Sequence, residues 1–98
     1  MDALQIERRT ALALLLDFYG PLLTERQRDV LARHIEQDLS YGEIAAQLRI
    51  SRQAVHDLVR RAAEALEDYE RRLGLAARFE RQRRALVEVR RLLREFDA

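Results

Sequence analysis

The chain has 98 residues, of which 48% are hydrophobic and 36% are charged, and its formal net charge is +1. This length allows one small domain, and the absence of Cys excludes disulfides, thiol nucleophiles and Cys-ligated metal sites. The apolar run 11–16 is much shorter than the roughly 20 residues that cross a bilayer, and no signal-peptide pattern opens the sequence. We therefore expect a soluble cytoplasmic protein without membrane insertion.

The first predicted helix covers residues 3–19, where Leu and Ala occupy most of the helix surface. A helix that is apolar on most sides is usually buried or shared with a partner subunit. Gly20 and Pro21 should end it, with Gly20 in the left-handed conformation and Pro21 unable to continue the helix.

Two capping boxes follow. Thr24 with Gln27 predicts the start of a second helix that runs to about residue 36, and Ser40 with Glu43 predicts a short third helix. In each box the first side chain accepts a hydrogen bond from the backbone three residues later, so the spacing itself indicates where a helix begins.

Two long helices are predicted in the second half of the chain. Ser51 should cap a helix of about 22 residues that ends at Gly74. The segment 75–96 then has apolar residues at alternating four- and three-residue steps, with one polar member, which is typical of a helix that packs along another. That series is Leu75, Phe79, Gln82, Leu86, Val89, Leu93 and Phe96.

The segment 40–61 has the spacing of a helix-turn-helix. Such a motif needs a small residue where its helices cross, apolar neighbours beside it, a plug in the turn and two anchors on the second helix. The residues at those offsets are Ala45, Ile44 and Leu48, Ile50, and Val55 with Leu58. Arg49 replaces the usual turn Gly, so a left-handed backbone there would be slightly strained.

The exposed early face of the second motif helix supplies candidate nucleic-acid contacts. The backbone amides at its N-terminus, with the first side chain, could hold a phosphate, and the next two side chains could reach base edges. The basic residues one and two turns later could touch the nucleic-acid backbone. The candidates are Ser51, Arg52, Gln53, His56, Arg60 and Arg61.

The same side chains have a plainer interpretation as a solvated surface. Arg60 and its neighbours could simply pair with Asp57 and Glu64, and Asp57 would repel phosphate. A strong DNA-binding protein usually concentrates positive charge on its reading domain. Here 40–73 is neutral, whereas 74–98 has seven Arg against four acidic residues.

No pattern of catalytic residues accompanies the motif. His34 and His56 are far apart and lack carboxylates at ligand spacing, which argues against a zinc site. There is no phosphate-binding Gly-rich loop and no nucleophile elbow. We expect no cofactor, no metal and no enzyme activity.

Three stretches carry a family resemblance: "LLLDFYGPLLTERQRDVL", "DLSYGEIAAQLRISRQAVHDLVRR" and "LEDYERRLGL". Across residues 14–75 the chain resembles the YlxM family of bacterial helix-turn-helix proteins, and "SYGEIAAQLRIS" also resembles region 4 of sigma factors. The resemblance implies a cytosolic regulatory protein tied to the signal recognition particle. It implies that the partner is the particle's RNA or its GTPase, with the reading helix of the family falling on Ser51, Arg52, Gln53, His56 and Arg60.

The predicted fold is all-α: a five-helix domain with a sigma-region-4-like helix-turn-helix and a long C-terminal amphipathic helix. Residues 1–74 should form the helical domain, with its motif at about 40–61, and 75–98 the amphipathic helix. That helix either folds back on its own chain or joins a homodimer, and the large apolar helix surface favours the homodimer.

Two functions remain open at this point. The first is a nucleic-acid-binding regulator that docks residues 52–61 on duplex DNA or a structured RNA. The alternative is an adaptor for the signal recognition particle GTPase, in which the helix-turn-helix is only structural. The residues do not decide between DNA and RNA, or between activation and repression.

Overall fold

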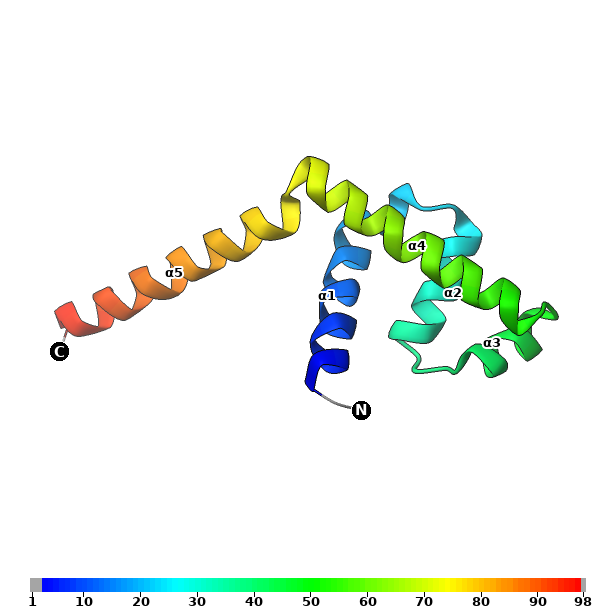
Figure 1. Ribbon diagram of the computed structural model, residues 1–98. Helices are drawn as coiled ribbons and strands as arrows, with labels where there is room; N and C mark the ends of the chain where they lie inside the picture. The colour runs from blue at the N-terminus through cyan, green and yellow to red at the C-terminus, as the bar shows by residue number, and fades with distance from the viewer. Residues whose placement is uncertain (1–2, 98) are drawn as a thin grey trace.

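The computed structural model describes residues 3–97, and the fold within that range is all-α, as predicted. Figure 1 shows the helices in chain order. They are α1 (Ala3–Tyr19), a 3₁₀ turn (Gly20–Leu22), α2 (Glu25–Ile35), α3 (Tyr41–Leu48), α4 (Arg52–Leu73) and α5 (Leu75–Asp97). None of the helices in the described range has the length and apolar character needed to cross a bilayer.

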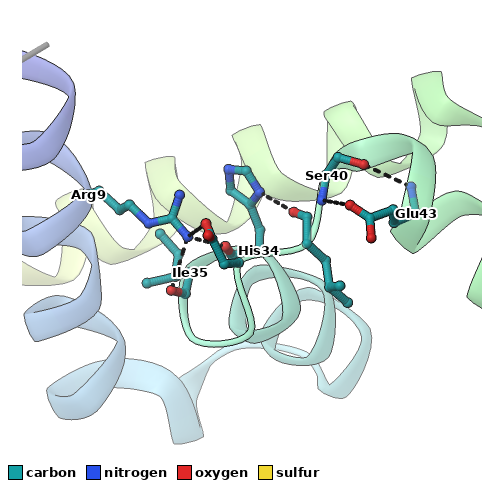
Figure 2. Close-up of polar contacts among 7 residues, drawn as sticks. Arg9, His34, Ile35, Ser40 and Glu43 are labelled. Carbon is teal, nitrogen blue, oxygen red and sulfur yellow. Dashed lines mark hydrogen bonds and ion pairs between the residues drawn. The ribbon is translucent and has the colours of Figure 1, made fainter. Parts of the chain in front are cut away.

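Both predicted capping boxes are present. The Thr24 hydroxyl accepts from the Gln27 amide at 3.1 Å, and the Gln27 side chain accepts from the Thr24 amide at 3.3 Å. Ser40 and Glu43 make the equivalent pair, both at 3.1 Å, as Figure 2 shows. These bonds satisfy amides that have no partner inside the helix, which is why α2 and α3 begin where the sequence indicates.

The prediction for Gly20 was wrong, because the chain turns there without a left-handed residue. Gly20 opens the 3₁₀ turn and is buried, and among the glycines only Gly74 has a positive φ. A Cβ added to Gly20 would lie 3.3 Å from Nε of Arg28 and 3.5 Å from Cδ1 of Leu16. Close approach of other side chains, rather than backbone conformation, therefore favours Gly at this position.

The core lies between α4 and the first three helices. It combines Leu and Tyr from the end of α1, a Val–Leu pair from α2, an Ile–Ala pair from α3 and one stripe along α4. Its buried members are Leu16, Tyr19, Val30, Leu31, Ile44, Ala45, Val55, Val59, Ala62 and Leu66. Because α4 contacts α1, α2 and α3, its orientation is set by all three.

Arg9 joins α1 to the end of α2 (Figure 2). Its Nη2 donates to the carbonyl oxygens of His34, at 2.7 Å, and Ile35, at 3.3 Å, and to the Asp38 carboxylate at 2.6 Å. These carbonyls lie in the last turn of α2, where helical partners run out. Asp38 has a φ of 59°, a left-handed conformation that Asp tolerates better than most residues.

A second polar joint fixes the bend between α4 and α5. The buried Tyr19 hydroxyl donates to Oε1 of Glu70 at 2.6 Å and accepts from the Leu75 amide at 3.0 Å. Glu70 also accepts from the Ala76 and Ala77 amides, at 3.0 and 3.1 Å, so it caps the N-terminus of α5. Gly74, with φ of 64°, makes the left-handed turn that was predicted there.

We expect Glu70→Gln to lower the free energy of unfolding by about 1–2 kcal/mol at pH 7, because hydrogen bonds to a charged acceptor are lost. Partial burial alone would raise the pKa of Glu70, but the hydrogen bonds from Tyr19, Ala76 and Ala77 outweigh it and lower that pKa. The stabilisation is therefore complete above the ordinary Glu pKa of about 4.3 and is lost as pH falls through the lowered value.

Urea unfolding of wild type and Glu70→Gln at several pH values measures this difference, which should narrow as the pH falls below about 4. Glu67→Gln is the matched control, because Glu67 lies exposed on the same helix. A difference between wild type and Glu70→Gln that stays constant with pH, or an equal effect of Glu67→Gln, would contradict the joint.

Beyond this bend, α5 leaves the rest of the molecule. Figure 1 shows it extending away, with only its beginning near α1 and α4. The Phe79 ring meets Phe18 of α1 edge-on, with centroids 5.6 Å apart, and Ala76 is the only buried residue of α5 within the described range. The molecule is consequently elongated, with principal extents of 60 × 29 × 20 Å.

Candidate nucleic-acid interface

The helix-turn-helix packs as its spacing predicted. Ile44 and Ala45 are buried where α3 crosses α4, and Val55 is buried on the facing side of α4. Leu48, Ile50 and Leu58 pack around them, half-buried against the same core. Six apolar side chains thus fix α4 relative to α3 and leave the opposite side of α4 in solvent.

Arg49 adopts the left-handed conformation that was expected, with φ of 56° and ψ of 45°. Its amide donates to the Ala45 carbonyl, and the Ile50 amide reaches the same oxygen at 3.1 Å. A non-Gly residue in this conformation costs on the order of 1–2 kcal/mol, which the packing of α3 and α4 offsets.

Ser51 caps α4, its hydroxyl accepting from the Ala54 amide at 3.0 Å. The amides of Arg52 and Gln53 come earlier in the first turn and have no carbonyl of the helix to bond. They lie beside exposed side chains at the positive end of the helix dipole, an arrangement that suits an anion.

The structure leaves all six candidate side chains exposed along α4, namely Ser51, Arg52, Gln53, His56, Arg60 and Arg61. Carboxylates occupy part of this face. Nε2 of Gln53 donates to Asp57 at 3.2 Å, and Arg60 lies 3.7 Å from Asp57 and 3.5 Å from Glu64. The ion pairing of the plainer interpretation is therefore present, but these pairs are solvent-exposed and each is worth only about 0–1 kcal/mol.

Three neighbours of the face were not predicted, because they come from other helices. The Tyr41 ring, at the start of α3, meets His56 edge-on at 5.7 Å between centroids. A Cβ added to Gly42 would lie 3.6 Å from Nε of Arg52, so Gly42 leaves room for that side chain. Arg8 of α1 lines a groove of about 290 Å³ together with Tyr41, His56 and Arg60.

Only the position of Tyr41, directly after the Ser40 cap, could have hinted at its contact from the sequence. The place of Arg8 depends on how α1 packs across the bundle, which no local pattern encodes. Within residues 3–97 no group of three or more His, Asp or Glu side chains is arranged to hold a metal ion.

Comparison with known proteins agrees with this geometry. The family described as "Putative helix-turn-helix protein, YlxM / p13 like" matches residues 6–95. A UPF0122 protein of Desulforamulus reducens is 47% identical over 85 residues, which are 87% of this chain and 73% of the relative. One from Symbiobacterium thermophilum is 49% identical over 86 residues, 88% of this chain and 80% of the relative. The chain belongs to the YlxM/p13-like family of helix-turn-helix proteins.

Proposed function

We propose that this protein is a regulatory protein that binds duplex DNA or a structured RNA through the N-terminal face of α4. The observation that supports this most is the exposure of one continuous polar face, from Ser51 to Arg61, on a helix held rigidly by α3. A second motif helix presented in this way is the arrangement with which helix-turn-helix proteins enter a groove.

In this proposal the first turn of α4 meets a phosphate through the Ser51 hydroxyl and the amides beside it. Arg52 and Gln53 reach base edges, where Arg suits guanine and Gln suits adenine. Arg60 and Arg61 touch the backbone of the nucleic acid. Since the pairs of Arg60 with Asp57 and Glu64 are weak and exposed, exchanging a carboxylate for a phosphate is inexpensive.

The charge distribution argues for moderate affinity. Residues 40–73 are neutral overall, so we expect dissociation constants of about 1 μM or weaker at physiological salt from one α4 face alone. We propose further that the protein acts as a homodimer. Two copies would place two α4 faces at a fixed separation, as recognition of paired half-sites requires.

The family resemblance suggests where the protein acts. We propose that it works in the cytoplasm within the signal recognition particle pathway, with the RNA of that particle as a structured ligand. It would act there by binding rather than by catalysis, because the six candidate side chains include no nucleophile–base pair or metal site.

A salt-titrated binding assay tests this proposal. The particle RNA, a random duplex DNA and the promoter of the protein's own operon are titrated with wild-type protein at several salt concentrations. Binding through phosphates predicts that log affinity falls linearly with log salt, by about 0.9 for each contact on duplex DNA. Affinity that does not respond to salt, or the absence of binding to all three ligands, would overturn the proposal.

The alternative function, an adaptor for the particle's GTPase, is favoured by one observation: most of α5 is exposed although its apolar residues recur regularly. It predicts binding to the purified GTPase after nuclease treatment, lost in Leu86→Asp or Leu93→Asp and retained in Arg52→Ala. Failure to retain the GTPase once nucleic acid is digested would exclude the adaptor.

A further inference from the structure

The apolar face of α5 is uncovered in the single chain. We define the α5 seam as the series that recurs at three- and four-residue steps along this helix, and three of its members have exposed fractions of 58%, 59% and 88%: Leu86, Leu93 and Phe96. The full seam is Leu75, Phe79, Gln82, Leu86, Val89, Leu93 and Phe96. Isolated helices gain most of their stability by packing such a face, so the seam needs a partner.

Charge argues against a second α5 as that partner. Arg78, Arg83 and Arg90 occupy the positions that flank the seam, and Asp97 at the far end is the only acidic residue among those flanking positions. In a coiled coil of two α5 helices these flanks face one another, and like charges there are unfavourable. The favoured partner is an apolar helix whose own seam contains an acidic residue.

Helix α1 of a second copy has those properties. Its outward face repeats the same three- and four-residue steps, which we call the α1 seam: Leu4, Glu7, Ala11, Leu14 and Phe18. Leu4 is 75% exposed and Leu14 is 36% exposed, and Glu7 and Ala11 are also exposed. The small Ala11 permits close approach of a helix, and Glu7 offers a negative charge to the Arg flanks of α5.

The two seams already meet at one point within the chain. Phe18 of the α1 seam and Phe79 of the α5 seam are in edge-on contact at 5.6 Å between centroids. Beyond this contact the helices diverge (Figure 1), so each seam continues into solvent. The uncovered parts are of similar apolar character and of complementary charge.

We infer that two copies of this chain exchange these helices, so that the α5 seam of each lies along the α1 seam of the other. This inference rests on the proposed homodimer and specifies its interface. The interface uses the sides of α1 and α5 and leaves Ser51 to Arg61 outside the seams, so the nucleic-acid-binding face of each copy stays accessible.

Light scattering on size-exclusion-purified protein tests the exchange. Wild type should have twice the 11.5 kDa mass of one chain. Leu14→Asp and Leu93→Arg should each be monomeric, because each buries an unpaired charge in both interfaces of the dimer. Mixing these two variants should restore the dimer, since one interface is then intact and the other pairs opposite charges. Arg84→Asp, on the far side of α5, should remain dimeric.

Other outcomes overturn the exchange in recognisable ways. A dimeric Leu14→Asp variant would indicate pairing of two α5 helices. A monomeric wild type would leave α5 for another surface, and binding to vesicles of anionic lipid would identify that surface as a membrane. Circular dichroism checks that Leu14→Asp folds, and Ala11→Arg replaces it if it does not. Salt-dependent RNA or DNA binding by a monomeric variant would separate failure of the exchange from failure of the proposed function.

Discussion

Replacing Arg52 and Arg60 together with Ala is expected to weaken binding to the particle RNA or duplex DNA by about ten- to a hundredfold. Each loses a cation that faces the ligand, and each phosphate contact removed should reduce the salt slope by about 1. Arg60 exchanges its weak pairs with Asp57 and Glu64 for a stronger charge-assisted bond to phosphate, so its loss affects the complex more than the free protein. Fluorescence anisotropy at three salt concentrations measures both quantities.

The matched control for that variant is Arg71→Ala with Arg72→Ala. These two residues are also exposed on α4 and paired with a carboxylate, Asp68, but they lie at the other end of the helix. The control removes the same net charge, so it separates local contact from a general electrostatic effect. Equal loss of affinity in both double variants would mean that the N-terminal face of α4 is not the binding surface.

Ile44→Ala is expected to lower the free energy of unfolding by about 2–5 kcal/mol, because it leaves a cavity where α3 crosses α4. Ile44 is fully buried and helps to fix α4 against α3. Against a total stability of roughly 5–10 kcal/mol for a domain of this size, the loss is large. Urea unfolding followed by circular dichroism at 222 nm measures it.

Ile6→Ala makes the same chemical change on the exposed side of α1, where Ile6 is 51% exposed. Its effect should stay within about 0.5 kcal/mol. At temperatures where Ile44→Ala remains folded it should also bind nucleic acid more weakly, since the orientation of α4 becomes less restricted. Equal stability of the two variants would contradict the packing described for the motif.

Local patterns carried most of the fold. Thr24 and Ser40 could be recognised as helix starts because a cap needs only side chains three residues apart. The left-handed residues at Arg49 and Gly74 followed from the ends of periodic segments in the same way. Gly20 failed because the constraint on it comes from Arg28, eight residues away and on another helix.

Contacts between distant segments were beyond the sequence. The Arg9 bonds to the end of α2 and the Tyr19–Glu70 joint link residues 25 to 51 positions apart, and nothing local marks either partner. The same applies to Tyr41 and Arg8 beside the candidate interface. The α4 face itself could be predicted because all six of its residues lie within eleven positions of one helix and its cap.

Amide chemical shifts of the labelled full chain, recorded during titration with the particle RNA and with duplex DNA, locate the bound surface directly. If α4 is the reading helix, the largest changes should fall on Ser51 to Asp57 and extend to Arg60 and Arg61, with smaller changes at Tyr41. Changes confined to α5, with the first two turns of α4 unaffected at saturation, would show that the helix-turn-helix does not touch the ligand.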